Sequence, residues 1–339
     1  MLTTPDFVAK KVIVIFPQKG DIIAFKNDNL IVSNAESKIK MQISCYKIFA
    51  VFVVGGFTLT TGIIERSKRF GFSIVFLTTS FRVYETINFK MEGNTLLRKK
   101  QYNTENATDI AKHIIINKIE NQREIIKLLR DNNNTEGINM LNFNIDRLVN
   151  SGNLSNYEIM GIEGVSSKIY FNRIFKEFEW KGRQPRVKRD KINLLLDIGY
   201  TILFNYIEAI LNIYGFDIYK GNLHQEFYKR KSLVCDIIEP FRPIIDYKIR
   251  KCFNLGSFNN YEFTFEKNQY SLNWKYSSDF LQIILEEIIL YRKCIFEYIQ
   301  SYYRWVIKEK DIKDFPKVRL EKEDAKQWGK RTWYWLVMI

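Results

Sequence analysis

Residues 221 to 243, GNLHQEFYKRKSLVCDIIEPFRP, contain one of the two histidines of the chain and two acids spaced three residues apart. On a helix, the carboxylates of Asp236 and Glu239 would share one face within about 6 Å of each other. Carboxylates that close repel each other, and a divalent cation or neighbouring Lys and Arg side chains would keep them ionised. The pattern therefore indicates a metal or phosphate site that includes His224. The alternative is a chance pair of acids beside a structural histidine.

A further acid, Glu163, lies in the segment MGIEGVSSKIYF between Gly161 and Gly164. Each glycine costs about 1 kcal/mol in a helix interior relative to alanine. A helix that accepts two of them near one acid indicates that something approaches its backbone closely. The alternative is a solvated glutamate on a partly exposed helix face.

The segment WKGRQPRVKRDK, residues 180 to 191, is strongly basic and also contains Gly182 and Pro185. This composition predicts an exposed cationic loop that follows a phosphate backbone, and a solvated loop is the alternative. A second basic run lies just after His224. The predicted DNA contacts are Arg183, Arg186, Lys188, Arg189, Lys229, Arg230 and Lys231.

The whole chain is basic, because 52 Lys and Arg residues stand against 38 Asp and Glu residues among 339, a formal charge of +14. Such an excess is typical of proteins that bind a polyanion. Nucleic acid is the leading candidate for that polyanion, and an anionic membrane surface is the second. The absence of Walker and Rossmann phosphate loops argues against an NTPase or a dinucleotide enzyme. GxSxG and HExxH motifs are also missing.

The four cysteines are far apart and form no CxxC motif, which argues against a zinc knuckle or a disulfide framework. They are interpreted as buried thiols in a reducing compartment, and the chain has no secretory signal pattern, so we expect a cytoplasmic protein. The apolar stretch at 48–64 reaches the lower length limit of a membrane helix. Its paired glycines and three threonines instead favour a buried strand, a tight turn and the start of a helix.

Hydrophobic periodicity predicts an α+β protein with a small β-rich N-terminal domain, residues 1–100, and a larger, mostly helical catalytic domain, residues 101–339. Short β-branched and aromatic runs separated by turn formers cover the first hundred residues, with one helix near 58–69 before a strand at 72–77. A helical stripe begins near residue 104. Further helices are expected at 136–149, 156–179, 190–214, 233–251 and 278–308.

Pro240 and Pro243 interrupt the predicted helix at 233–251. Proline lacks an N–H group, so in a continuous helix the carbonyls of Asp236 and Glu239 would lose their donors four residues on. A bend is expected there, which would either direct these acids into a cleft or turn the chain at a domain edge.

Four motifs follow one another in a characteristic order: GIEG, then GR before DKINLLLDIGYTILFN, then GFDIYKGNLH, and finally SLVCDIIEPFRP. Their order, after a β-rich N-terminal region, resembles the CRISPR spacer-acquisition integrases, the Cas-one family. The resemblance extends from the N-terminal strands to about residue 250. Lys191 stands where the family often has a proline.

The resemblance implies a metal-dependent DNA endonuclease and integrase that inserts short DNA fragments into a CRISPR array by attack of a 3′-OH on a phosphodiester of the repeat. It implies Glu163, His224 and Glu239 as catalytic ligands of Mg²⁺ or Mn²⁺, with Asp236 as an assisting acid. Asn193 and Tyr200 match family positions that support the site or DNA. One imidazole and two carboxylates suit such a divalent ion.

The resemblance also implies a homodimer, with dimers bridged by a smaller partner, the Cas-two protein, and with the β-rich domain contributing to dimerisation. Two other functions remain open at the level of the sequence. The first is a stand-alone nuclease that is selective for branched DNA. The second is a non-catalytic nucleic-acid-binding scaffold, whose acids would serve only salt bridges.

Overall fold

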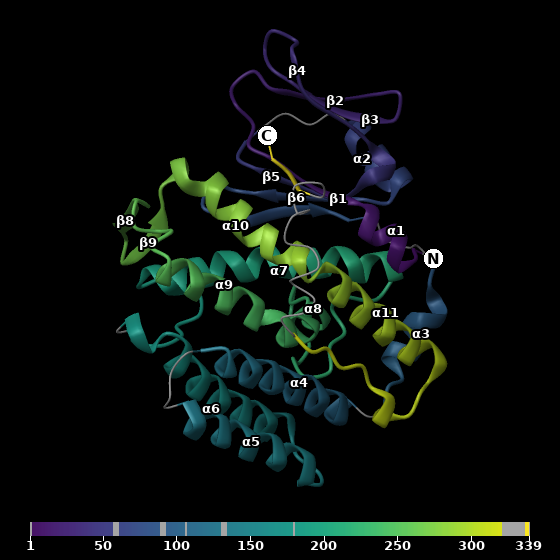
Figure 1. Cartoon of the computed structure of the whole chain (residues 1–339). Coiled ribbons are helices and arrows are strands. Elements are labelled where there is room, and N and C mark those ends of the chain that lie inside the picture. The colour runs from purple at the N-terminus through teal and green to yellow at the C-terminus, as the bar shows by residue number, and fades with distance from the viewer. Residues whose placement is uncertain are drawn as a thin grey trace.

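The computed structural model of the chain describes residues 2–56, 61–88, 93–105, 107–129, 134–178, 180–320 and 336–338. A three-stranded sheet, a five-stranded sheet and a larger helical part form successive layers, with the five-stranded sheet in the middle (Figure 1). The predicted α+β class, with a β-rich N-terminal region and a larger helical region, is confirmed.

The five-stranded sheet has the strand order β10-β1-β5-β6-β7. Strands β10, β1, β5 and β6 run parallel, and β7 pairs antiparallel with β6. Every residue of β5 is buried, as expected for a strand covered on both faces. The strands are β1 (Lys11–Ile15), β5 (Ile48–Val54), β6 (Ser73–Leu77), β7 (Val83–Ile87) and β10 (Leu336–Met338).

The three-stranded antiparallel sheet covers one face of the larger sheet. Its first hairpin turns at Asn27 and Asp28, which both adopt positive φ, as a two-residue turn requires. Residues such as Val51 and Val53 of β5 pack into the core on this side, whereas Phe52 and Val54 face the helices. The elements of this layer are β2 (Ile22–Lys26), β3 (Asn29–Ser33), β4 (Ile39–Ser44), the 3-10 turn η1 (Cys45–Lys47) and α2 (Thr61–Phe70).

The helical part packs on the other face of the five-stranded sheet. Aromatic contacts join the two layers, because the ring of Phe49 in β5 lies 5.0 Å from that of Tyr206 and 5.0 Å from that of Phe7. The helices are α1 (Thr4–Ala9), α3 (Thr95–Tyr102), α4 (Ala107–Lys127), α5 (Asn134–Asn150), α6 (Asn156–Ile174), α7 (Lys191–Tyr214), α8 (Ser232–Ile238), α9 (Arg242–Asn254), α10 (Ser277–Leu290) and α11 (Arg292–Lys308).

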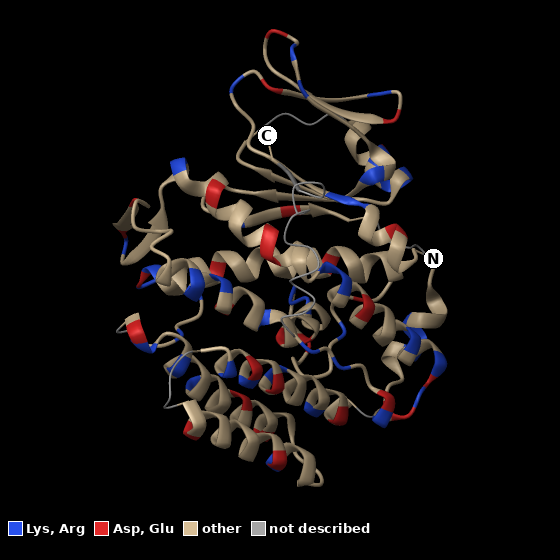
Figure 2. Ribbon diagram, in the orientation of Figure 1, with Lys and Arg blue, Asp and Glu red and all other residues tan. Residues whose placement is uncertain are grey.

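Short elements connect these helices. They are the 3-10 turns η2 (Lys176–Phe178), η3 (Glu239–Phe241), η4 (Trp274–Tyr276) and η5 (Ile312–Asp314), and the hairpin of β8 (Phe263–Glu266) and β9 (Gln269–Leu272). Acidic and basic residues are interspersed along the lower helices of the molecule rather than separated onto two faces (Figure 2).

Helix α7 runs through the centre of the helical part. Asp190 caps its N-terminus by accepting a hydrogen bond from the N–H of Asn193, and Gly215 ends it in a left-handed conformation. The helix is long and apolar enough to cross a membrane, but 83% of its apolar window is buried in the protein. It is therefore the core helix around which α8, α9, α10 and α11 pack.

Several predicted elements are confirmed and others were missed. The strand at 48–54 and the bend after Asp236 are present, and the bend takes the form of η3 with Pro240 in its first turn. The predicted helix at 278–308 is instead two helices that meet at Tyr291. Local patterns did not predict α1, α3 or the β8-β9 hairpin, nor that β10 pairs with β1 across more than 300 residues of sequence.

Two helical glycines differ sharply in what surrounds them, which predicts opposite effects of alanine. A Cβ at Gly199 in α7 would lie 2.5 Å from Cγ2 of Ile245, whereas a Cβ at Gly161 in α6 would meet nothing within 4 Å. Gly199→Ala should therefore destabilise the protein by about 1–3 kcal/mol through overpacking. Gly161→Ala should stabilise it by up to about 1 kcal/mol.

Thermal unfolding of the two variants beside the parent protein measures this difference. A rise in Tm for Gly199→Ala would show that α9 yields at this contact more easily than the packing indicates.

Candidate active site

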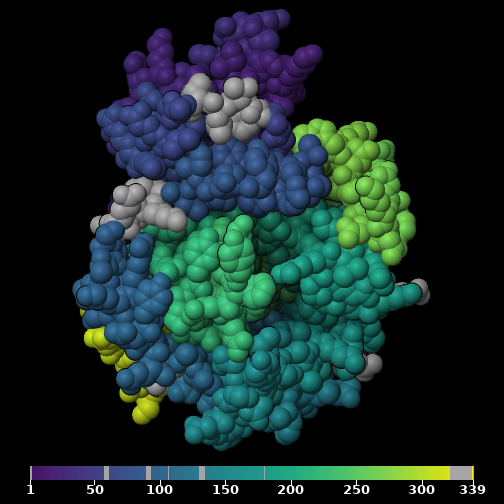
Figure 3. All heavy atoms as spheres, turned by 180° about the vertical axis from the view of Figure 1, so that it is seen from behind, coloured from purple at the N-terminus to yellow at the C-terminus, as the bar shows by residue number. Residues whose placement is uncertain are grey.

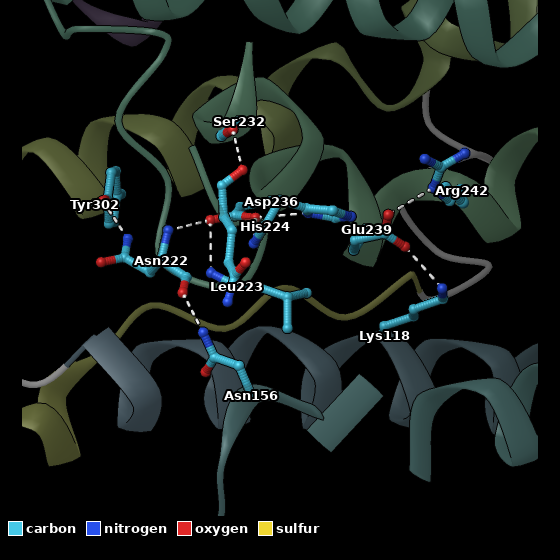
Figure 4. A network of polar contacts seen from close by, with 11 residues as sticks. Lys118, Asn156, Asn222, Leu223, His224, Ser232, Asp236, Glu239, Arg242 and Tyr302 are labelled. Atoms are coloured by element: carbon cyan, nitrogen blue, oxygen red, sulfur yellow. Dashed lines mark hydrogen bonds and ion pairs between the residues drawn. The ribbon is translucent and has the colours of Figure 1, made fainter. Parts of the chain in front are cut away.

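The three acids and the histidine predicted from sequence lie on three elements of the helical part and on the segment that joins α7 to α8. Glu163 is on α6, His224 follows α7, Asp236 is on α8 and Glu239 begins η3. The structure divides them into two polar groups, Glu163 with Glu239 and His224 with Asp236. Figure 4 shows the second group, and it shows Glu239 between Lys118 and Arg242.

Lys118 of α4 joins the first group. Its ammonium contacts Oε1 of Glu163 and lies 2.7 Å from Oε2 of Glu239. The side chain of Lys118 is only 8% exposed and that of Glu239 7%, so the contact between them forms in a largely dehydrated place, whereas Glu163 is 26% exposed. Burial lowers the pKa of the Lys118 amine, but the two carboxylates outweigh burial and raise it. The ammonium is therefore held in its charged form between the two acids.

Glu239 is buried and fully paired. Its Oε1 accepts a hydrogen bond of 2.9 Å from Nε of Arg242, while Oε2 faces Lys118. Burial raises the pKa of Glu239, but Arg242, Lys118 and His224 together lower it to about 2. The carboxylate is consequently ionised at neutral pH although it is buried.

The bend at η3 directs Glu239 toward α4. Pro240 lies at the start of the 3-10 turn, and the N–H of Glu239 bonds to the carbonyl of Asp236 in the tighter pattern. The carbonyl of Pro240 accepts a hydrogen bond of 2.9 Å from Asn121, one helical turn beyond Lys118 on α4. The bend thus turns Glu239 to a buried position against Lys118 of α4.

Asp236 organises the segment that carries His224. The carboxylate is fully buried and accepts three backbone N–H bonds, at 2.5 Å from Asn222, 3.0 Å from Leu223 and 3.0 Å from His224. Its Oδ1 also lies 2.7 Å from Nδ1 of the His224 ring. Because a carboxylate only accepts, the imidazole proton is assigned to Nδ1, which leaves the lone pair of the neutral ring on Nε2.

The donor set fits a divalent cation in its chemistry. Two carboxylates from α6 and η3 already face one positive charge, the Lys118 ammonium, and His224 has a ring nitrogen available. Among the residues that the structure describes, no three His, Cys, Asp or Glu side chains are placed to hold a metal together. A metal at this place would therefore require the ammonium to leave the carboxylates.

Comparison with known proteins identifies the family. The model of the family described as CRISPR associated protein Cas1 matches residues 14–286. The chain belongs to the Cas1 family.

Relatives of the chain carry the same family name. A CRISPR-associated endonuclease Cas1 of Thermodesulfovibrio yellowstonii is 26% identical over 88% of this chain and 98% of the relative. A CRISPR-associated protein Cas1 of Methanobrevibacter ruminantium is 28% identical over 73% of this chain and 80% of the relative. The resemblance seen in the motifs is thus confirmed.

Solved structures share the fold. A casposase bound to an integration product superposes with a TM-score of 0.76 at 19% identity, covering 96% of this chain and 99% of the casposase chain. A Cas1 protein from Thermotoga maritima superposes with a TM-score of 0.75 at 20% identity, covering 88% of this chain and 97% of the other. A chain of a Cas6-RT-Cas1–Cas2 complex has a TM-score of 0.76 at 22% identity, with 93% of this chain and 36% of that chain covered.

Two positions singled out by the Cas1 resemblance connect the acidic site to the basic loop. The ring of Tyr200 contacts two guanidinium groups, with its centroid 4.6 Å from Cζ of Arg242 and 5.3 Å from Cζ of Arg183. Its hydroxyl donates a hydrogen bond to Asp246, a carboxyl whose pKa is raised to about 7 by burial. Asn193 is buried and bonds to Arg183, to Gly182 and to Asp190, so it holds the loop against α7.

The basic loop at 180–191 combines internal anchors with exposed cations. Arg183 is an anchor, because its guanidinium lies 2.5 Å from Asp197 and is only 15% exposed. Arg186 and Arg189 are exposed, and Lys188 is half-buried. The predicted role of the loop in DNA binding therefore applies most directly to Arg186 and Arg189.

The second basic run divides in the same way. Lys229 is exposed, with its ammonium 5.2 Å from the Tyr228 ring, whereas Lys231 pairs with Glu208 at 2.7 Å. Arg230 is half-buried beside Cys235.

The surface of the helical part is hollowed on the face seen from behind (Figure 3). The hollow lies beside a green segment, and green is the colour that the bar gives to the part of the chain with His224 and Glu239.

Sequence reasoning missed Lys118 and Arg242 as members of the site. Lys118 lies four residues after Ile114 and one before Ile119, so it falls on the apolar stripe of α4. Charged residues are almost never fully buried without a partner, and a lysine inside a buried stripe is thus a signal for a buried acid. The neighbouring Asn117, Asn121 and Gln122 are also buried polar residues of this helix.

The Asp236 contacts predict a stability test. Asp236→Asn would place an amide donor against backbone N–H donors, which should cost about 1–3 kcal/mol of unfolding free energy. His224→Ala should cost less, because it leaves the three backbone bonds to Asp236 intact. Urea denaturation of both variants measures the difference, and equal losses of stability would show that the ring contact dominates.

Proposed function

We propose that this Cas1-family chain is an integrase of CRISPR adaptation, a metal-dependent enzyme that joins the 3′-OH end of a short DNA fragment to a phosphodiester of the CRISPR repeat. The observation that carries the proposal is the convergence of Glu163 and Glu239 on one buried cation, beside a histidine oriented by Asp236. Relatives named CRISPR-associated endonuclease Cas1 and a casposase bound to an integration product support this chemistry.

Glu163, Glu239 and Nε2 of His224 are the groups that would hold Mg²⁺ or Mn²⁺. Bound there, the ion would polarise the phosphodiester and stabilise charge on the leaving oxygen. Asp236 acts as a positioning residue, because its bond to Nδ1 fixes which ring nitrogen carries the lone pair. Arg242 pairs with Glu239 at 2.9 Å and helps to keep its carboxylate ionised.

The proposed reaction exchanges one P–O bond for another. The 3′ oxygen of the fragment gives up its proton and bonds to phosphorus, the bond from phosphorus to the 3′ oxygen of the repeat strand breaks, and that departing oxygen takes up a proton to become a 3′-OH. With water as the nucleophile, the same site would cleave DNA.

DNA is held chiefly through its phosphates in this proposal. Arg186, Arg189 and Lys229 are exposed cations on the two segments that flank the site. Phe227 and Tyr228, which follow His224, are 76% and 80% exposed, and such rings stack on unpaired bases. We further propose a homodimer that works with a small Cas2 protein, as the fold shared with a chain of a Cas6-RT-Cas1–Cas2 complex suggests.

Substitution of the ligand groups should stop catalysis. Glu163→Gln, His224→Ala and Glu239→Gln should each reduce joining of a 3′-OH oligonucleotide to a supercoiled plasmid by at least about 100-fold, since each removes a group that holds the charge-stabilising ion. DNA affinity should remain close to that of the parent, because the proposed phosphate contacts lie on other residues. Glu177→Gln, at a carboxylate 57% exposed and paired with Arg250, is the matched control and should join normally.

The same assay separates the alternative functions. Plasmid nicking without joining would indicate a nuclease for branched DNA, and normal joining by Glu239→Gln would remove this residue from the site. DNA binding with neither reaction in the parent protein, and no change on adding Mn²⁺, would indicate a scaffold.

The exposed arginines of the basic loop should contact phosphates. Replacing Arg186 and Arg189 by Gln should weaken DNA binding and reduce the slope of log affinity against log salt by about one unit for each phosphate that the variant no longer neutralises. Fluorescence anisotropy over a range of salt concentrations measures this slope. Lys19, just before β2, and Lys26, the last residue of β2, are both exposed and provide a control pair with the same change of charge. An unchanged salt slope in the Arg variant would show that the loop does not contact phosphates.

A further inference from the structure

We propose that Lys118 is the resident counter-ion of the metal-free site, and that a divalent cation binds only by displacing its ammonium from Glu163 and Glu239. The inference rests on the proposed function, since it concerns the same carboxylates. It adds a positioning residue on α4 that none of the catalytic motifs contains.

The ammonium occupies the place where the two acids converge. Its contacts are Oε1 of Glu163 and Oε2 of Glu239, one oxygen from each carboxylate. The other oxygen of Glu239, Oε1, accepts a hydrogen bond of 2.9 Å from Nε of Arg242. Oε1 of Glu163 also accepts a hydrogen bond of 2.7 Å from Ser167. A metal bound by both carboxylates through these oxygens would therefore compete directly with Lys118.

Lys118 is well placed to keep the acids together in the absence of metal. Its side chain is 8% exposed and that of Glu239 7%, so the contact between them is poorly screened by water. Two carboxylates drawn to one position in such a place would repel each other without a cation. The ammonium offsets that repulsion and keeps the side chains of Glu163 and Glu239, on α6 and η3, close to α4 in the metal-free protein.

The same contact opposes metal binding. An ammonium and a divalent cation repel each other strongly at contact distance in a protein interior, so both cannot occupy the position between the carboxylates. Metal affinity is then reduced by the free energy needed to move Lys118 out. Lys118 therefore keeps the two carboxylates together in the metal-free protein, and for the same reason it weakens the affinity of the site for a divalent cation.

The test is Mn²⁺ affinity at pH 8, measured from the electron paramagnetic resonance signal of free Mn²⁺ during titration of the full-length protein. Lys118→Met keeps the length of the side chain but removes its charge, and should lower the Kd for Mn²⁺ by at least about tenfold. It should also lower the Tm of the metal-free protein and enlarge the rise in Tm on adding Mn²⁺. Lys118→Arg keeps a cation and should bind Mn²⁺ about as weakly as the parent.

Lys248→Met is the matched control. Lys248 forms a part-buried pair with Glu287 at 3.1 Å, between α9 and α10, so this variant loses a comparable ion pair outside the site. Its Kd for Mn²⁺ should equal that of the parent. If Lys118→Met binds Mn²⁺ no more tightly than the parent does, the ammonium does not compete and the inference is wrong.

A second measurement needs no variant and decides the question if Lys118→Met fails to fold. Acetylation of Lys118 by an N-hydroxysuccinimide ester, followed by mass spectrometry, should be slow in the metal-free parent and several-fold faster with saturating Mn²⁺, because displacement frees the amine. Unchanged or slower acetylation with bound Mn²⁺ would overturn the inference.

The outcomes also separate this inference from the proposed function. If Glu163→Gln abolishes Mn²⁺ binding while acetylation of Lys118 does not respond to Mn²⁺, the metal site stands and only the displacement fails. If the parent binds no Mn²⁺, or if Glu163→Gln binds it unchanged, the proposed metal site fails and the inference with it.

Discussion

Two carboxylates from separate helices face a single lysine ammonium in the interior of this protein, and the arrangement of the surrounding helices depends on that contact. Lys118, Glu163 and Glu239 belong to α4, α6 and η3, and the loss of Lys118 would leave Glu163 without this cation and the buried Glu239 with Arg242 alone. The contact therefore constrains where α6 and η3 lie on α4. It also shows how a basic chain keeps acids ionised, because Lys118 and Arg242 lower the pKa of Glu239 although burial alone would raise it.

The histidine is held by a different device. Asp236 accepts three consecutive backbone N–H bonds as well as the ring contact, so one buried carboxylate determines both the path of residues 222–224 and the orientation of the imidazole. Space around it is limited, since a Cβ at Gly221 would lie 2.9 Å from Oδ2 of Asp236. Asp236 is itself held in place by core packing, because its helix α8 and the following helix α9 both pack on the buried helix α7. The position of residues 222–224 therefore follows from that of α8.

Much of the fold and part of the site could be predicted from the sequence. Helical and alternating periodicities predicted the central helices and strand β5, since the burial pattern of each repeats within a few residues. The motif series predicted Glu163, His224, Asp236 and Glu239 as site residues, and the structure brings them into two adjacent polar groups. Lys118 was missed because its partners lie 45 and 121 residues away in the chain. The hydrophobic periodicity of a helix carries no information about contacts between residues so far apart in the sequence. The hairpin of β8 and β9 and the pairing of β10 with β1 were missed as well.

The sequence by itself determined the charge of the chain, the class of the fold, the family and the residue types available to the site, because composition, periodicity and motif order are local properties. Only the tertiary structure decided which of those charged residues form ion pairs inside the protein and which are exposed to solvent. It assigned Arg183 to anchor the basic loop on Asp197, Lys231 to pair with Glu208, and Arg186 and Arg189 to solvent. Likewise, it paired Asp236 with His224 and gave Glu239 to Lys118, because a buried charge must find its partner in space, wherever that partner lies in the sequence.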